Sequence, residues 1–461
     1  MGREKLEFTN PVIVLLGCMT LFVIAACANA DSPSLSAVPT QSEATTTPPE
    51  IDQQIPEEQD ISVQESNNEA EVEVDQEEII VEEVVPSSRG VSDTTVRIGI
   101  IKTGDVFSDI ELGVEARISR INAEDETNAR GIEIVQVIDD GGDPQMALEA
   151  AQSMANQDVF AIVLASIAAD RTVTDYLAEQ NIPFFGWGFL EGYCYPNQWG
   201  FGFNGCLNGH ALDISGASVD DGSLRVSKIF YGRQPTVILV TTSDVAGDAM
   251  EATVSKVWGE NLVAVVRIPP TQDSGIAESI LEEIGNVDSD MLWLSIGLGK
   301  TLQAKAQLIS AFPGMVVDDV TYLPGILREY ETSKELEGGY VFTQFPPQEE
   351  YREAATLIAT DLENINGPLI YSQAISLGYW SADFLTHLLN QVGEELNTRT
   401  FFNMANVQGT VYSPDASGGP CALMTALVHQ DPSGGLALLQ VRGGVFRPVV
   451  DFDCPDRYWE N

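Results

Sequence analysis

The stretch from Ile132 to Ser166 constrains the fold more than any other part of the chain. It opens with an apolar run that predicts a buried strand, which ends at an Asp-Asp-Gly-Gly sequence. The helical spacing of apolar residues then predicts an amphipathic helix over Pro144–Asn156, with Asp143 as its N-cap. A second apolar run, Val159–Leu164, completes a strand–helix–strand unit. Such a unit belongs to a parallel sheet, and ligands bind beyond the carboxyl ends of its strands, where Ser166 lies.

Length and charge set further limits on the kind of protein. The chain has 461 residues, enough for two or three domains, and its hydrophobic content of 44% supports a large core. Its formal net charge is −46 at pH 7. This charge argues against nucleic acid as a partner, because the phosphate backbone would repel the protein.

Residues 1–26 are predicted to be a lipoprotein signal peptide. The segment Pro11–Ala26 is almost wholly apolar and is too short to span a membrane comfortably. It ends in Ile24-Ala25-Ala26-Cys27, which resembles a bacterial lipobox. We therefore expect lipid on Cys27 and an anchor at the outer face of the bacterial cytoplasmic membrane. An ordinary signal peptide and an uncleaved anchor are the alternatives.

Cys18 lies in the signal peptide and Cys27 is the expected lipid site, which leaves four cysteines for the folded part. An even number of cysteines in an exported chain suggests disulfides. Three pairings are possible in principle, and the short spacings favour Cys194–Cys206 and Cys421–Cys454. The sequence has no Cys-x-x-Cys pair, so it does not indicate a zinc ribbon.

Residues 27–92 are predicted to be an acidic disordered linker. They carry 16 acidic residues against one basic residue, Arg89, and no aromatic residue. Such a segment cannot bury enough apolar surface to fold, although Ile79–Val85 could form a transient strand. The linker would hold a folded domain away from a membrane, or act as an acidic interaction tail.

The folded part is expected over residues 93–461. Strands and helices alternate in two successive runs, which favours two Rossmann-like lobes over one large sheet. Long helices are predicted over Gln348–Asn364 and Tyr371–Val392. Short strands separated by turns are predicted for the tail, Ala422–Val450.

Several segments together resemble a known family. They are Val-Arg-Ile-Gly-Ile at 96–100, a helix that ends in Arg-Ile-Asn, and the stretch at 131–163. This pattern is similar to the type I periplasmic binding proteins, and most of all to the branched-chain amino acid (Leu/Ile/Val) receptor family of ABC transporters. The segments 201–206, 343–347 and 378–384, with the two tail cysteines, resemble a lipoprotein subgroup with two disulfides.

The resemblance covers roughly Val91–Cys454 and implies an α/β fold of two lobes. Three crossover strands would join the lobes, the ligand would bind in a cleft between them, and a hinge would close them over it. Lobe 1 would comprise about 93–207 and 347–409. Lobe 2 would comprise about 209–344 and 411–461.

The resemblance also places the ligand among the loops that follow the strands. By position, the expected ligand-binding residues of lobe 1 are Thr103, Asp105, Phe107, Ser166, Ile167, Ala168, Trp187 and Gly188. Those of lobe 2 are Asp244, Val245, Ser295, Gly297 and Gly325.

Individual roles follow in part from the same resemblance. Ser166 would grip a carboxylate of the ligand, aided by the backbone N–H groups of Ile167 and Ala168 at a helix N-terminus. The acidic residue expected to meet an amino group is not evident at Pro324–Gly325, and Asp244 or Asp105 could replace it. Trp187 is either a platform for the ligand or a residue packed under the loop between Cys194 and Cys206.

Other motifs carry less weight. The segment Gly297–Thr301 looks like the end of a P-loop, but Leu294 stands where that motif needs glycine, so nucleotide binding is not favoured. The acidic segment Asp139–Asp143 lacks the spacing of an EF-hand and is better explained as a turn with a helix cap. We find no nucleophile with a matching base, and therefore expect neither an enzyme nor a cofactor or metal site.

The sequence therefore predicts an extracytoplasmic, lipid-anchored solute-binding protein of an ABC importer. We expect it to be a monomer that binds an amino acid or a similar small polar solute by hinge closure and delivers it to an ABC permease. The alternative is a ligand-sensing receptor that signals to a membrane partner. The sequence does not name the solute.

Overall fold

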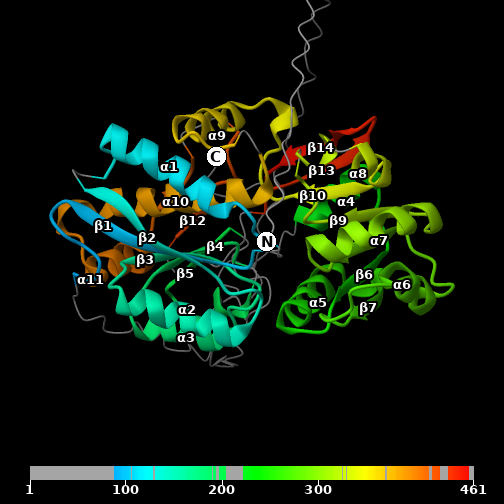
Figure 1. The fold of residues 1–461 in the computed structure, drawn as a ribbon, viewed down its shortest axis with the longest axis horizontal. Helices are drawn as coiled ribbons and strands as arrows, with labels where there is room; N and C mark the ends of the chain where they lie inside the picture. Colours follow the sequence, from blue (N-terminus) through cyan, green and yellow to red (C-terminus); the bar gives the residue numbers. More distant parts are fainter. Residues whose placement is uncertain are drawn as a thin grey trace, which may run out of the picture. The chain divides into compact units, whose positions relative to one another are not determined.

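The computed structural model describes residues 88–455 except 105, 128–129, 189, 194–196, 204–221, 324, 329, 369–370, 415–417 and 426–433. All described residues belong to the compact unit of residues 79–461. Their strands form two main sheets, each flanked by helices, which confirms the predicted α/β class with two lobes (Figure 1). No helix among the described residues is long and apolar enough to cross a membrane.

The first sheet is built from residues 95–202 and is parallel throughout. Its strand order is β2-β1-β3-β4-β5. The strands are β1 (Thr95–Lys102), β2 (Gly131–Asp139), β3 (Ala161–Ala165), β4 (Phe184–Gly186) and β5 (Gly200–Gly202). All five residues of β3 are buried, as expected of a strand with parallel neighbours and helices on both faces.

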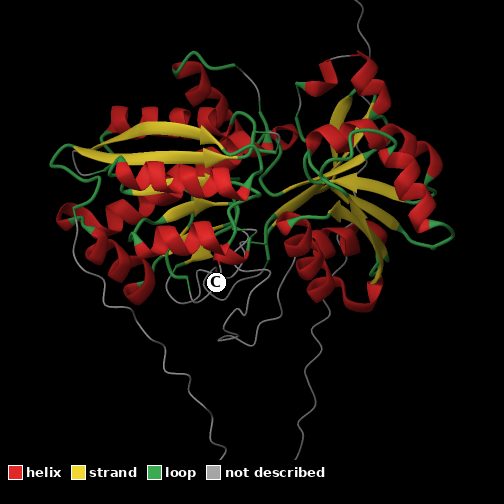
Figure 2. Cartoon of the chain, turned by 60° about the horizontal axis from the view of Figure 1, so that its bottom comes forward, coloured by secondary structure: helices red, strands yellow, loops and turns green. Residues whose placement is uncertain are grey.

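Helices cover both faces of the first sheet (Figure 2). Helices α1 (Ile110–Glu124) and α10 (Gln373–Val392) pack on one face, and α2 (Pro144–Asn156) and α3 (Arg171–Glu179) on the other. Helix α2 has the predicted bounds because Asp143 accepts hydrogen bonds from two backbone N–H groups of its first turn. Gly113 allows α1 and α10 to approach closely, since a Cβ there would lie 2.0 Å from the carbonyl oxygen of Ile375.

The second sheet is mixed, with the order β14-β13-β10-β9-β8-β6-β7. The strands that pair in parallel are β6 (Val237–Thr242), β7 (Leu262–Ile268), β8 (Met291–Ser295), β9 (Met315–Asp318) and β10 (Tyr340–Thr343). Strand β13 (Leu436–Arg442) runs antiparallel to β10, and β14 (Val445–Asp453) antiparallel to β13.

Two pairs of helices enclose the second sheet. Helices α6 (Ile276–Ile284) and α7 (Leu298–Ala311) share one apolar core with it. Helices α4 (Gly222–Tyr231) and α5 (Val245–Trp258) share another. The remaining helices are α8 (Tyr330–Glu335), α9 (Glu353–Asn364), α11 (Thr398–Phe402) and a π-helix over Asn403–Gln408, besides single 3₁₀ turns. A two-stranded sheet pairs β11 (Val411–Tyr412) with β12 (Leu423–Met424).

The helix predicted over Gln348–Asn364 is wrong in its first turn. A 3₁₀ turn covers Gln348–Glu350, and α9 starts only at Glu353. Between them Tyr351 has a φ of 53°, in the left-handed region. The chain turns here because Glu350 accepts a hydrogen bond from the backbone N–H of Phe452 and Arg352 donates one to its carbonyl oxygen. These contacts with β14 replace a continuous helix.

The predicted disulfide Cys421–Cys454 is present, with an S–S distance of 2.06 Å. The predicted Cys194–Cys206 bridge lies outside the described residues, as does Cys27. The lobe boundaries stay a prediction, and the expected boundary between lobe 1 and lobe 2 near residue 208 falls outside the described part of the chain.

Candidate functional site: a cavity at the carboxyl ends of the strands

A cavity of about 340 Å³ is lined by residues from both sheets. Loops after β1, β3 and β4 line it from the first sheet, and loops after β6, β8 and β9 from the second. All these loops follow the carboxyl ends of parallel strands, which is where ligands bind in open α/β sheets. The cavity is therefore the candidate ligand site.

The antiparallel strand β13 also contributes to the cavity. It runs opposite to β10, so its first residues lie at the edge where β10 ends. Gly434, Gly435 and Leu436 line the cavity there, together with Gly222 and Ser223 at the start of α4. The tail strands and α4 thus complete a wall that the parallel strands alone do not provide.

Most residues predicted to bind ligand do line the cavity. They are Thr103, Phe107, Ser166, Ile167, Trp187, Gly188, Asp244, Ser295 and Gly297.

Four predicted residues stand apart from this set. Ala168 is buried in the core beneath α3, Val245 is 41% exposed outside the cavity wall, and Gly325 does not line the cavity. Helix periodicity explains the second case, because Ala246, the next residue of α5, lines the cavity instead. Asp105 lies outside the described residues.

The loop after β3 differs from the anion site expected there. The N–H of Ala168 donates to Ser166 Oγ at 2.9 Å, and the N–H of Ile167 donates to Thr103 Oγ1 at 3.2 Å. Thr103 in turn donates to Asp140 Oδ1 at 2.6 Å. The expectation that these two N–H groups serve a ligand is therefore wrong, since internal acceptors already use them. The Ser166 hydroxyl keeps its proton for the cavity, because its oxygen accepts from Ala168.

An acidic residue that the sequence analysis missed lies in the cavity wall. Asp319 directly follows β9, and its Oδ2 accepts a hydrogen bond from the Ser295 hydroxyl at 2.9 Å. Burial, reinforced by the charge of neighbouring Asp318, raises the pKa of Asp319 from 3.8 to about 7. A signal was available, because Asp318 and Asp319 end an apolar run, Met315–Val317, in the sequence.

A buried ion pair holds the loop that carries Asp319. Lys305 and Asp318 are fully buried and form a salt bridge, and Lys305 also donates to the carbonyl oxygen of Tyr340 at 2.7 Å. The other carboxylate oxygen of Asp318 accepts from the N–H groups of Val320 and Thr321 at 2.9 and 2.7 Å. Both charged groups thus have hydrogen-bond partners besides each other, so the ion pair fixes the backbone on both sides of Asp319.

Asp244 has a structural task that reduces its availability to a ligand. Its Oδ1 accepts from the N–H of Gly247, at the start of α5, and from the hydroxyl of Thr242 at 2.6 Å. It is therefore the N-cap of α5 as well as a lining residue. Asp319 accepts from the Ser295 hydroxyl and caps no helix, so it is the better candidate for a ligand's amino group.

Aromatic side chains form much of the rest of the wall. Trp187 is half-buried and packs edge-to-face on Phe107, with ring centroids 5.2 Å apart. Trp293 packs in the same way on Phe342 at 5.3 Å. Both pairs line the cavity, so it is largely apolar. Lys300, in the first turn of α7, is the one cationic residue that lines it within the described part of the chain.

Among the described residues, the His, Cys, Asp and Glu side chains form no group of three or more that could hold a metal ion. The segment Asp139–Asp143 is a turn in which Asp139 accepts from the N–H groups of Gly104 and Gly141. These hydrogen bonds use the carboxylates as turn and cap acceptors, as the sequence predicted.

Residues 95–444 match the family model of the periplasmic binding proteins. The chain therefore belongs to the periplasmic binding protein family, a family of binding proteins and not of enzymes. A comparison with curated protein sequences found no significant match.

Solved structures of solute-binding proteins share the fold. One is a branched-chain amino acid ABC transporter protein from Thermus thermophilus with bound valine, at 13% identity and a TM-score of 0.63; the match covers 78% of this chain and 97% of that one. Another is an ABC transporter solute-binding protein from R. palustris in complex with benzoate, at 15% identity, a TM-score of 0.59 and the same coverages. A third is a fatty acid ABC transporter substrate-binding protein from Thermomonospora curvata, at 18% identity and a TM-score of 0.59, covering 80% and 94%. At these identities the likeness concerns the fold alone.

Proposed function

We propose that the protein is the solute-binding component of an ABC importer. It binds one small solute, an amino acid or a compound of similar size, in the cavity at the strand ends, and the lobes close over the solute by a hinge. The observation that carries this proposal is the cavity itself, which brings Ser166, Trp187 and Asp319 together from two sheets. Its volume of about 340 Å³ lies in the range of small-molecule sites.

The lining chemistry favours a solute with an apolar body and an amino group. The pairs Trp187–Phe107 and Trp293–Phe342 offer flat apolar surface, whose burial is worth roughly 25 cal/mol per Å² of apolar area. Asp319 offers a carboxylate to an ammonium group. A carboxylate on the same solute would find the Ser166 hydroxyl or the Lys300 ammonium.

A solute that lacks an amino group fits the cavity less well. Its carboxylate would share a partly buried space with Asp319, and like charges there are unfavourable. Because the pKa of Asp319 is about 7, such an acid would bind only with Asp319 protonated near neutral pH. The valine-binding relative is therefore a closer guide to the solute than the benzoate-binding one.

The mature protein would be held at the membrane by lipid on Cys27, with residues 27–92 as the tether. This part of the proposal rests on the lipobox-like sequence Ile24–Cys27 and on the acidic composition of the linker. A monomer on such a tether can reach a permease in the same membrane.

A thermal-shift screen of amino acids, amides, urea and aromatic acids tests the proposed binding. A compound bound only by the native state stabilises it by about 2.7 kcal/mol at 100 times its Kd, which raises the unfolding midpoint. We expect amino acids with apolar side chains to raise the midpoint of the parent and not that of Asp319→Asn. If no amino acid shifts the parent, or if the shift survives Asp319→Asn in full, the proposed solute class is wrong.

Uptake measurements separate transport from signalling. Deletion of the protein should abolish uptake of the radiolabelled compound found in the screen, and the chain with Cys27→Ser should restore it poorly. Normal uptake in the deletion strain would favour the receptor alternative.

A further inference from the structure

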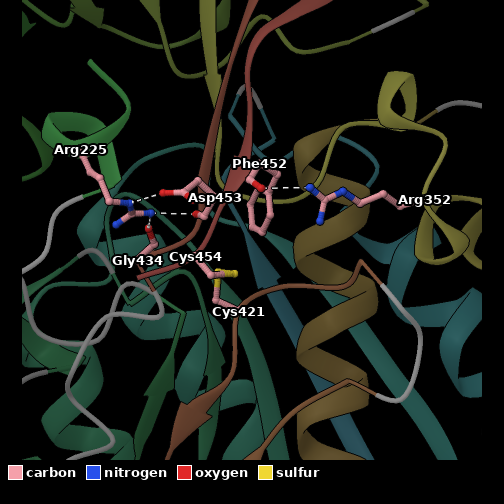
Figure 3. Close-up of a disulfide and its surroundings, with 7 residues drawn as sticks. All are labelled: Arg225, Arg352, Cys421, Gly434, Phe452, Asp453 and Cys454. Carbon is pink, nitrogen blue, oxygen red and sulfur yellow. Dashed lines mark hydrogen bonds and ion pairs between the residues drawn. A yellow bond between two sulfur atoms is a disulfide. The ribbon is translucent and has the colours of Figure 1, made fainter. Parts of the chain in front are cut away.

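The disulfide Cys421–Cys454 lies directly behind one wall of the cavity. Gly435 lines the cavity, and a Cβ placed on it would lie 2.5 Å from Cys421 Sγ and 2.5 Å from the Phe452 ring. No side chain separates this stretch of backbone from the sulfur. Figure 3 shows the disulfide beside Gly434, at the end of the tail strand.

Cys421 belongs to a segment that is anchored on α10, over the first sheet. Tyr412 of β11 stacks on Phe384 of α10 with centroids 4.7 Å apart, and its hydroxyl donates to Asp383 at 2.7 Å. Strand β11 pairs with β12, which begins two residues after Cys421. A Cβ on Gly419 would lie 3.3 Å from the Trp380 ring, also of α10.

Cys454 belongs to the other sheet. It directly follows Asp453, the last residue of β14, and β14 pairs with β13 in the second sheet. The disulfide therefore links a segment packed on a helix of the first sheet to a strand of the second. It does so one layer behind the residues that line the cavity.

Two arginines also hold this wall by hydrogen bonds. Arg225 of α4 donates to the carbonyl oxygens of Gly434 and Asp453, both at 2.8 Å, and to the Asp453 carboxylate at 2.6 Å (Figure 3). Arg352 donates to the carbonyl oxygen of Phe452 at 3.0 Å. The stretch Gly434–Leu436 thus lies between Arg225 and the pair formed by the disulfide and Phe452.

We propose that the Cys421–Cys454 disulfide is a positioning element of the ligand cavity. It holds Gly434–Leu436 against the cavity, so that breaking it loosens this wall and weakens solute binding beyond its effect on global stability. The effect on binding rests on the proposed function; the effect on the wall rests on the geometry alone.

The double variant Cys421→Ala, Cys454→Ala tests both parts. We expect backbone amide exchange at residues 434–438 to rise by about tenfold or more, because a local restraint on this opening is lost. We expect the affinity for L-phenylalanine or benzoate, used as separate probes in calorimetry, to fall by about tenfold, a change typical of residues that couple through contact.

Reduction offers a second route to the same state. Cys454 is exposed, so dithiothreitol can reach the bond. The two thiols of dithiothreitol are oxidised to a cyclic disulfide, while Cys421 and Cys454 gain two electrons and two protons and become thiols. Because dithiothreitol would also reduce the predicted Cys194–Cys206 bridge, the reduction is done in a chain that carries Cys194→Ala and Cys206→Ala. Reduction of that chain should change exchange and affinity as the double variant does.

A matched control separates positioning from global stability. Ile358 is fully buried in α9 and does not line the cavity, so Ile358→Ala lowers stability by creating an internal void. We expect Ile358→Ala to keep the parent's probe affinity and its local exchange at 434–438. The cysteine double variant and Ile358→Ala are compared at equal unfolding midpoints. If they then show the same probe affinity and the same exchange at 434–438, the disulfide is a general stabiliser and the proposal is overturned.

Gly435→Ala tests the contact itself with the disulfide intact. Its Cβ would press on Cys421 Sγ and Phe452, so the wall should move and probe affinity should fall. In the Cys421→Ala, Cys454→Ala background the loss should be smaller, because the sulfur is gone. Equal losses in both backgrounds would show that Gly435 and the disulfide are not coupled.

Solute binding and the positioning role of the disulfide can be disproved separately. If neither probe binds the parent but exchange at 434–438 still depends on the disulfide, the proposed function falls and the positioning role stands. If the probes bind and neither affinity nor exchange depends on the disulfide, the positioning role falls alone.

Discussion

Ser295 donates its hydroxyl proton to Asp319 across 2.9 Å, at the ends of the neighbouring strands β8 and β9. The two residues are 24 positions apart in the chain and meet because parallel strands end at the same edge. A hydroxyl donor favours the ionised carboxylate, while burial and Asp318 oppose it. The balance leaves Asp319 able to change charge near neutral pH.

We expect Asp319→Asn to alter the pH dependence of stability. The pKa of Asp319 is raised from 3.8 to about 7 in the folded state, so the folded protein holds this proton more tightly than the unfolded chain. The contribution of Asp319 to the free energy of unfolding is therefore complete below about pH 4 and is lost as the pH rises through about 7. Between about pH 4 and 7 the unfolding midpoint of the parent should therefore fall relative to that of Asp319→Asn. Calorimetry without solute measures this difference.

Binding supplies the complementary test of the same residue. Affinity of the parent for L-phenylalanine should rise as the pH increases through 7, because the ionised carboxylate attracts the ammonium group. Asp319→Asn should bind weakly with no such rise. A pH-independent affinity in the parent would place the ammonium group elsewhere.

We expect Ser166→Ala to weaken solute binding without unfolding the protein. A hydrogen bond to a charged group is worth roughly 1.5–3 kcal/mol, so affinity for L-phenylalanine should fall by about tenfold or more. Ser153→Ala is the matched control, because Ser153 lies in α2 and does not line the cavity. Calorimetry that finds equal affinities for the two variants would contradict the assigned role of Ser166.

We expect Lys305→Met to destabilise the fold strongly. It would leave Asp318 charged and buried without its partner, a change that typically costs about 3–5 kcal/mol. Lys300→Met is the control, since Lys300 is partly exposed and is not part of the buried pair; its cost should stay within about 0.5 kcal/mol. Urea denaturation measures both, and a similar cost for the two would argue against a structural ion pair.

We expect Cys27→Ser to release the protein from membranes or to block its processing. The reason is chemical, because a serine at this position lacks the sulfur that would carry the lipid. Membrane fractionation and the mass of the mature protein check this, with Cys18→Ser as the control. Unchanged processing and retention in Cys27→Ser would favour an ordinary signal peptide or an uncleaved anchor.

The local parts of the fold could be predicted from the sequence. Helix α2 begins and ends at the predicted residues. Its start is set locally, because Asp143 caps the helix and Pro144 occupies its first position. The strand ends beside Thr103, Ser166 and Trp187 were also found, since apolar runs stop there. These features depend on neighbours in the sequence.

The parts that were missed depend on distant residues. The N–H of Ile167 is used by Thr103, 64 positions away, so no local pattern could reveal that the expected anion site is occupied. Tyr351 interrupts a helical pattern because Glu350 binds Phe452, 102 positions later. Asp319 was overlooked for a different reason: the family resemblance drew attention to Pro324–Gly325, while the end of β9 lies earlier.

The tail strands described above also determine when the protein can fold. The second sheet is complete only with β13 and β14, at residues 436–453, and one face of the first sheet is fully covered only once α10 has been made, at residues 373–392. A ribosome that has made the chain up to β10 has therefore finished neither half, and the edge of β10 is still open to wrong partners. The first sheet depends on α10, which is made after most strands of the second sheet, and the second sheet depends on β13 and β14, which are made after α10. We therefore expect stable tertiary structure in both halves only after α10 and the tail strands have been made.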